Sequence, residues 1–456
     1  MKTRFMPVVI VLVMTLIAAT LAPISFAQDP QPVTIVTWER PTPDEPEWVH
    51  ELREAEIAAF QAEYPWITVQ DELTPVGTDY RQTYDRSLAA GTEPTVWNLV
   101  AFVDVQTRIN NGTIGELTDC VTGWDLWENG QVFSAFGDSL FGPEGSVYAI
   151  PSYAYQQGLI YNRRLAEEAG LDPDAPPTTW DELVEWGVAM TDASKPQFGF
   201  GLIGMAWNAW PFAQFTHLAG GQMIAPNGDG TWRITFTEDA GVEALMFWHS
   251  MIWEHRMVQQ DVLRDFGPLL EDFQQERVAM FWGNIDFLVE AGRKFETPLE
   301  NFGIAPMPAG PNGRPGNLAG GETWTISPNA TPEQAAAACD YIKFMTYNQE
   351  TLENRWTVQN DNNALDGRPS MRLDLNKLDF ATNWPAHWAP AFQQVTANTM
   401  AEPYADHYNE IKDLLAEPIQ SVLLNENATA DDARAALEGV AEEAYSRFPE
   451  TYQPGS

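Results

Sequence analysis

Short apolar runs and amphipathic segments alternate along the chain. Residues 33–38 (VTIVTW) and 67–73 (ITVQDEL) have the composition of β-strands, and between them apolar residues recur at helical spacing from Trp48 to Ala59. A strand, a helix and a strand at this spacing predict a βαβ unit with parallel strands. The alternation continues, with strands expected at 95–100, 198–203, 278–282, 302–305 and 323–327 and helices at 79–90 and 162–169.

Helix starts and one hairpin can be located from local motifs. Thr179 to Glu182 and Thr331 to Gln334 have the spacing of capping boxes, and Pro332 suits the first position of the second helix. The turn residues Asn227 to Gly230 separate two short apolar runs and predict a β-hairpin. Strands and helices are interleaved throughout, so the sequence predicts an α/β protein.

One apolar stretch has a polar middle. Residues 147–162 read VYAIPSYAYQQGLIYN, and their two ends resemble buried strand. A strand inside a core should not carry two adjacent glutamines, Gln156 and Gln157. Either this is an edge strand with a polar face, or something other than core packs against the middle of the stretch.

The N-terminal 27 residues have the features of a secretory signal peptide. Lys2 and Arg4 precede an apolar segment, and small residues at Ser25 and Ala27 predict cleavage near Ala27. A membrane anchor is the rival interpretation, but the apolar segment is short for a span of about 20 residues. We therefore expect an exported protein that lies in the periplasm or on the outer face of the membrane.

Charge excludes some partners. The formal net charge is −39, from 64 acidic and 25 basic residues, so the chain should repel nucleic acid and anionic membrane surfaces.

The two cysteines, Cys120 and Cys339, favour a disulfide in an oxidising compartment, and two buried free thiols are the alternative. Neither cysteine has a histidine or a second cysteine at ligand spacing, so no metal site is expected.

The sequence contains no HExxH, GxSxG or phosphate-binding loop motif, and its carboxylates single out no acid–base pair. Its clearest signal is aromatic, because the chain has 18 tryptophans. Several stand beside amides or carboxylates at expected strand ends, which suits a neutral polyhydroxylated ligand: rings cover its C–H faces and polar groups bond its hydroxyls. These residues are Trp38, Glu39, Trp97, Trp207, Asn208, Trp210, Trp282, Asn284, Asp286, Glu322 and Trp324.

Longer motifs resemble a known family over nearly the whole mature chain. They include YAIPSYAYQQGLIYNRRLAEEAGLD followed by TTWDELVEWG, then ERVAMFWGNIDF and NFGIAPMPAGPNGRPGNLAGGETWTIS. In this order they are similar to the extracellular solute-binding proteins of ABC importers, in the sugar-binding group that includes maltose-binding protein. One departure is Thr95, which follows Pro94 where the family usually has an aspartate.

The resemblance implies a two-lobed α/β fold of the periplasmic-binding-protein kind, each lobe a mostly parallel sheet flanked by helices, with the ligand between the lobes. Residues 28–151 and 303–366 would form lobe 1, and residues 152–302 and 367–456 would form lobe 2. The polar middle of 147–162 would then line the ligand site, which adds Tyr155 and Gln157 to the candidates. Cys120 and Cys339 would both lie in lobe 1, which favours their disulfide.

The implied function is capture of a sugar or oligosaccharide by hinge closure and its delivery to an ABC permease. The protein would be a monomer that needs no cofactor and is not an enzyme. Two rivals stay open. The same fold could hold a polyamine, a peptide or a glycerol-phosphate, or the chain could be a carbohydrate-active enzyme of the cell envelope.

Overall fold

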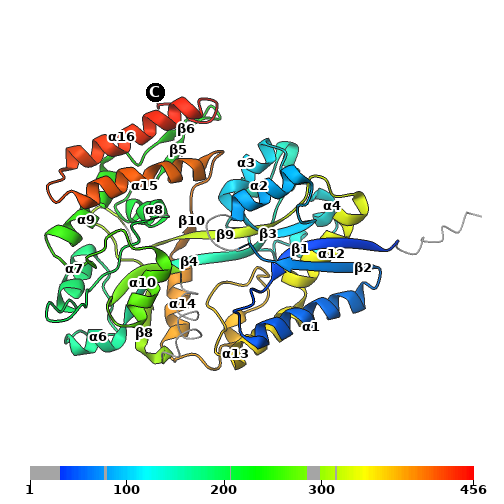
Figure 1. Ribbon diagram of the computed structural model, residues 1–456, viewed down its shortest axis with the longest axis horizontal. Helices are drawn as coiled ribbons and strands as arrows, with labels where there is room; N and C mark the ends of the chain where they lie inside the picture. Colours follow the sequence, from blue (N-terminus) through cyan, green and yellow to red (C-terminus); the bar gives the residue numbers. More distant parts are fainter. Residues whose placement is uncertain (1–30, 76–79, 206, 285–297, 314–315, 456) are drawn as a thin grey trace, which may run out of the picture.

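Two α/β lobes lie side by side and share one sheet of eight strands (Figure 1). The computed structural model describes residues 31–75, 80–205, 207–284, 298–313 and 316–455, so the expected signal peptide lies outside the described residues. The first lobe contains β1 to β3 with α1 to α5, α12 and α13, and the second contains α6 to α10 and α14 to α16. The expected two-lobed α/β architecture is confirmed.

The first lobe is built on the predicted βαβ unit. β1 (Val33–Arg40) pairs in parallel with β2 (Ile67–Leu73) and with β3 (Val96–Ala101), and α1 (Glu47–Glu63) connects the first two. The apolar side of α1 buries Phe60 against the lobe's core. The other helices of this lobe are α2 (Tyr80–Ala90), α3 (Val105–Asn110), α4 (Thr118–Val121), α5 (Asp125–Glu128), α12 (Pro332–Tyr347) and α13 (Gln349–Asp361).

Two long strands join the lobes. β9 (Asn317–Ile326) pairs antiparallel with β3 along one side and with β4 (Ile150–Asn162) along the other. The second half of β4 pairs antiparallel with β7 (Met280–Asn284) and β8 (Phe302–Ala305), while β10 (Thr399–Ala401) lies parallel to β9. Residues 159–161 of β4 have partners on both sides, whereas residues 153–156 pair with β9 alone among the described strands. The strand is therefore an edge strand along part of its polar middle and an interior strand beyond it.

Helices cover the second lobe. The helices α8 and α9 lie between the sheet and the surface helices α15 and α16 (Figure 1). The short hairpin of β5 and β6 carries the predicted turn. The bounds in this lobe are α6 (Arg163–Glu168), α7 (Trp180–Ala189), β5 (Ile224–Pro226), β6 (Trp232–Ile234), α8 (Ala209–Leu218), α9 (Asp239–Trp253), α10 (Phe266–Gln274), α14 (Trp388–Ala397), α15 (Tyr408–Leu424) and α16 (Ala430–Arg447).

Some sequence expectations need correction. The parallel arrangement holds for β2, β1 and β3, whereas every pairing of β4 is antiparallel, so the shared sheet is mixed. Residues 198–203 make isolated bridges instead of a continuous strand. The expected capping box at Thr179 is half formed, because Thr179 accepts from the Glu182 amide while the Glu182 carboxylate accepts from Thr178. The box at Thr331 is complete.

Two of the expected lobe boundaries also differ from the strand pairing. β8 pairs with the second-lobe half of β4, and the strand that pairs with both lobes is β9, which begins at Asn317. After the boundary expected at 366–367, the chain still pairs with the first lobe, because Val132 and Arg372 form a bridge.

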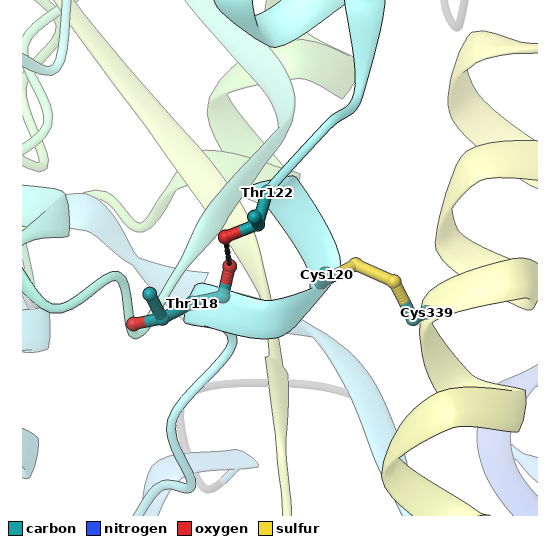
Figure 2. Close-up of a disulfide and its surroundings, with 4 residues drawn as sticks. All are labelled: Thr118, Cys120, Thr122 and Cys339. Carbon is teal, nitrogen blue, oxygen red and sulfur yellow. Dashed lines mark hydrogen bonds between the residues drawn. A yellow bond between two sulfur atoms is a disulfide. The ribbon is translucent and has the colours of Figure 1, made fainter.

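A disulfide joins Cys120 in α4 to Cys339 in α12, as expected (Figure 2). The two Cα atoms are 5.5 Å apart although 219 positions separate the residues in sequence. Both helices belong to the first lobe, so the bridge lies within one lobe and does not tie the lobes together. Among the described residues no helix is both long and apolar enough to cross a membrane.

Candidate functional site

One face of the shared sheet gathers aromatic and polar side chains where the lobes meet. Directly opposite residues of an antiparallel pair point to the same face. Tyr153 lies opposite Glu322, and Gln157 lies opposite Asn284. Tyr155 lies opposite Gly320, and its hydroxyl donates to Glu322 Oε1 at 3.4 Å.

The helix α8 places a tryptophan over this face. The ring of Trp210 lies edge-on to Trp282 of β7, with centroids 5.2 Å apart, and 6.2 Å from the ring of Tyr155. A β-carbon added at Gly320 would meet Trp210 Cζ2 at 2.9 Å. The absence of a side chain at Gly320 therefore lets the indole approach the sheet. We call Tyr153, Tyr155, Gln157, Trp210, Trp282, Asn284 and Glu322 the interlobe cluster.

Replacing Gly320 by alanine should displace the Trp210 indole. The new methyl group would also lie 3.4 Å from Tyr155 Cδ2, so the crowding is on two sides. Overpacking of this kind costs about 1–3 kcal/mol. We expect a lower free energy of unfolding in urea and an altered tryptophan emission spectrum. Gly267→Ala is the matched control, because a β-carbon there meets nothing within 4 Å. Equal behaviour of the two variants would contradict the packing role of Gly320.

Several buried polar atoms of the interlobe cluster have no hydrogen-bond partner in the described part of the chain. Such atoms are costly in a folded protein and need an explanation. Gln157 is fully buried, and neither its Oε1 nor its Nε2 is bonded. The others are Trp210 Nε1, Trp282 Nε1, Asn284 Oδ1 and Glu322 Oε2. Buried unbonded atoms also occur elsewhere, as on the indoles of Trp180 and Trp248, but this group shares one sheet face and its covering helix.

Glu322, whose carboxyl group faces the cluster, is only 7 % exposed as a residue. Burial raises its pKa well above the usual range, and the nearby Asp104 raises this pKa further. The hydrogen bond from Tyr155 and the charge of Arg81 act in the opposite direction. Because burial is the largest cause, the group is held in a state that favours accepting or sharing a proton.

The two adjacent glutamines point to opposite faces. Gln156 donates from Nε2 to Thr396 Oγ1 of α14 at 2.9 Å and accepts a bond from the same hydroxyl. Gln156 therefore fastens β4 to a covering helix. Gln157 belongs to the interlobe cluster, so the polar interruption of residues 147–162 has two separate structural reasons.

Four predicted site residues lie instead within the first lobe. Trp97 is buried and stacks on Tyr84, and Trp38 lies edge-on to it and donates to Glu72. Trp324 is buried and donates from its indole to Thr346 at 2.7 Å. Glu39 accepts from Arg53 at 3.0 Å. Their contacts give these four side chains packing and structural roles.

Two more predicted residues lie beside α8. Trp207 is 44 % exposed, has a left-handed backbone conformation (φ 71°) and stacks on Phe266. Asn208 is fully buried and donates to the carbonyl of Ala416 in α15 at 3.0 Å, so it fastens two helices. The expected loop around Trp210 is the first turn of α8, where Pro211 is tolerated. Asp286 lies outside the described residues.

Sequence reasoning missed Tyr153 and Asp104. The alternation of Tyr153, Tyr155 and Gln157 along one strand would have revealed the first, since every second residue faces the same way. Asp104 gives no local signal, because its proximity to Glu322 arises from the pairing of Ala101 in β3 with Glu322 in β9. Among the described residues no group of histidine, cysteine, aspartate and glutamate side chains is arranged to hold a metal ion.

The chain is similar to proteins of known fold over nearly its full length. A solute-binding protein of Thermotoga lettingae bound with α-D-tagatose has a TM-score of 0.74 at 21 % identity, covering 90 % of this chain and 99 % of the other. Maltose-bound MalE3 of T. maritima has a TM-score of 0.73 at 22 % identity, covering 91 % and 100 %. UgpB of Mycobacterium tuberculosis in complex with glycerophosphocholine has a TM-score of 0.72 at 20 % identity, covering 91 % and 99 %. These likenesses show the fold.

The sequence itself matches a family description, bacterial extracellular solute-binding protein, over residues 47–351. The match includes β4, β7 and α8, which carry most of the interlobe cluster, and ends in α13 of the first lobe. The resemblance expected from the sequence motifs is thereby confirmed, and the chain belongs to the bacterial extracellular solute-binding proteins.

Proposed function

We propose that this protein captures a saccharide between its lobes and delivers it to the permease of an ABC importer. The observation that carries the proposal is the mixture of unbonded donors and acceptors beside indole rings. Trp210 and Trp282 offer N–H donors, Glu322 and Asn284 offer oxygen acceptors, and Gln157 offers both. A sugar hydroxyl donates and accepts at once, and its ring presents C–H faces to aromatic side chains.

The likeness to tagatose- and maltose-bound proteins supports a sugar, although the glycerophosphocholine complex has the same fold. A phosphate ester would call for an arginine clamp. Near the cluster, Arg368 lies over the ring of Tyr153 and pairs with Asp366 at 2.7 Å. The Arg368 guanidinium is already paired with the buried carboxylate of Asp366 and so does not form a phosphate clamp. We therefore favour a saccharide over a phosphate ester.

The site residues come from both sides of the hinge region. β4 and β9 run through it, and α8 brings Trp210 from the second lobe. Rotation of the lobes about these strands would expose the cluster and then bury it around a ligand, which is the hinge closure described for binding proteins. Binding without chemical conversion is part of the proposal.

We also propose that the chain is exported as a monomer after cleavage near Ala27. Family members are extracellular or periplasmic, which supports export. On this view the permease is the protein partner, and the second lobe and first lobe together present the surface that it meets.

A ligand screen with two tryptophan variants tests the proposal. At 100 times its dissociation constant a ligand should stabilise the protein by about 2.7 kcal/mol, which a thermal-shift assay detects. We expect a shift with mono- or oligosaccharides and no loss of the added sugar over time. Trp210→Ala should weaken binding by about a hundredfold, because it removes a ring and a donor together.

Trp207→Ala is the matched variant at the start of the same helix. Its exposed ring stacks on Phe266 outside the cluster, so its effect on affinity should be less than about threefold. A shift only with peptides or phosphate esters would overturn the saccharide. Hydrolysis of the added sugar would identify an enzyme instead. Equal effects of the two variants would move the site away from the cluster.

A further inference from the structure

Two buried carboxyl groups lie together beside the interlobe cluster. Glu322 in β9 is the register partner of Ala101 in β3, and the helical turn η1 (Phe102–Asp104) follows at once. Asp104 is therefore brought next to Glu322, and the two groups interact electrostatically. Both side chains belong to residues that are only 7 % exposed.

Each carboxyl group has one bonded oxygen and one unbonded oxygen. Asp104 Oδ1 accepts from Asn409 Nδ2 at 2.6 Å, and Glu322 Oε1 accepts from the Tyr155 hydroxyl at 3.4 Å. Asp104 Oδ2 and Glu322 Oε2 have no donor among the residues described. Two neighbouring acceptors thus await hydrogen-bond donors, and burial without donors is unfavourable.

Two guanidinium groups act on Asp104, those of Arg81 and Arg108, and Arg108 is already paired with Asp85 at 2.9 Å. Arg81 Nη1 lies 3.9 Å from Asp104 Oδ2, beyond hydrogen-bond length, and its Nη2 lies 3.8 Å from Asp413. One guanidinium is therefore shared between two aspartates, and within the described chain Glu322 has no ion pair of its own. Burial raises the pKa of both groups and favours their protonated forms, whereas a bound cation would stabilise both as carboxylates, which a neutral hydroxyl cannot do.

Aromatic rings line the same place. Tyr155 contacts Glu322 directly, Tyr153 is the register partner of Glu322, and Tyr80 interacts electrostatically with both carboxyl groups. Trp97 supports Tyr80 from behind, with ring centroids 6.3 Å apart. Rings beside carboxylates are the surroundings that suit a cation, because the ring faces attract positive charge. The fully buried and unbonded Gln157 lies on the same sheet face, four positions along β4 from Tyr153, and indicates independently that the interlobe cluster receives a ligand.

We propose that Asp104 and Glu322 together bind an ammonium group, so that the ligand is a saccharide or polyol carrying an amine. The proposal rests on the proposed saccharide function and extends it. An ammonium group has three donors and a full charge, which matches two unbonded oxygens in a region of excess negative charge. The sugar ring would then extend from the carboxyl pair towards Trp210 and Trp282. Asp104 becomes a specificity-determining residue.

Matched pairs of probes test this inference. Glucosamine is compared with glucose, and the dimer of glucosamine with cellobiose, by isothermal titration calorimetry on the purified protein. The aminated member of at least one pair should bind about tenfold more tightly or better. Spermidine, which carries amines without a sugar ring, is the third probe. No preference for the amine within either pair, or no binding of any aminated probe, overturns the inference.

Isosteric variants locate the preference. Asp104→Asn keeps the size and the bonded oxygen but removes the charge, so it should lose about tenfold or more in affinity for the amine and less than about threefold for the neutral sugar. Glu322 also belongs to the interlobe cluster, so Glu322→Gln should weaken binding of both sugars and weaken that of the aminated one more. Asp413→Asn is the control, since Asp413 shares Arg81 but its side chain is 69 % exposed. Circular dichroism and thermal unfolding verify the fold of each variant.

The outcomes separate the two proposals. Equal affinity for neutral and aminated sugars overturns the ammonium site and leaves the saccharide function standing. Binding of spermidine alone supports the ammonium site and overturns the saccharide. Equal losses for both members of a pair in Asp104→Asn would assign Asp104 to hydroxyl recognition and would overturn the proposed specificity.

Discussion

Replacing Arg53 by methionine should destabilise the first lobe by about 3–5 kcal/mol, the cost of leaving buried carboxylates without their partner. Arg53 Nε and Nη2 donate to the two oxygens of Asp71 at 2.9 and 2.8 Å, and Nη2 also donates to Glu39 at 3.0 Å. The guanidinium further donates to the Tyr341 hydroxyl at 2.6 Å. Methionine preserves the apolar stem, so the loss reports the charge network.

The measurement is the free energy of unfolding of the whole protein in urea. Arg434→Met is the matched control, because Arg434 pairs with Asp239 at 2.7 Å on the surface, where the aspartate side chain is 98 % exposed. Exposed pairs contribute about 0–1 kcal/mol. If Arg53→Met costs no more than Arg434→Met, the buried network does not stabilise the lobe.

The hydrogen-bond network of Arg53 also allows a test of whether Glu39 contacts the ligand or stabilises the first lobe. We read this residue from the sequence as a ligand contact, whereas the structure surrounds it with Arg53, Tyr341 and Asn98. Glu39→Gln should therefore lower the free energy of unfolding and leave ligand affinity unchanged within about threefold. A large loss of affinity with an unchanged stability would restore the original interpretation.

The elements of the fold could be predicted where local chemistry decides them. β2 and β8 lie where their apolar runs were expected, and the Thr331 capping box begins α12 as predicted. The start of β9 was missed, because Leu318 to Gly321 alternates too little to resemble a strand and is held by its pairing with β10 and β4. A strand was expected at residues 198–203 and is absent there. Gly199 and Gly201 let the chain lie close to neighbouring segments, but the segment makes only isolated bridges with them.

The site was harder to predict than the fold. Trp282 and Trp324 both stand at strand ends beside polar residues, but the Trp324 indole finds Thr346 in α12 and that of Trp282 finds no described partner. The difference lies in tertiary neighbours, which the local sequence does not contain. Tyr155 and Gln157 were expected at the site because the family resemblance assigned the polar middle of their strand to it, and the structure brings both side chains into the interlobe cluster. Asp104 required knowledge of which strands pair.

Removing the disulfide should lower stability without changing ligand binding. In the chain-entropy model a crosslink closing a loop of this length contributes about 5 kcal/mol, and loss of a native disulfide typically costs about 2–5 kcal/mol. Cys120 and Cys339 are both nearly buried, so the double variant Cys120→Ala, Cys339→Ala keeps apolar side chains at both positions. We expect its urea midpoint to fall, and addition of a reductant should lower the midpoint of the parent but not of the variant.

The ligand affinity of the double cysteine variant tests whether the disulfide affects the arrangement of the two lobes. The bridge connects α4 to α12 within the first lobe, while the interlobe cluster lies on β4, β7, β9 and α8 (Figures 1 and 2). Closure of the lobes therefore does not require the bridge to move relative to either helix. Titration of the double variant should give a dissociation constant within about threefold of the parent. A loss above tenfold, under conditions where the variant is folded, would show that the bridge helps to set the arrangement of the two lobes.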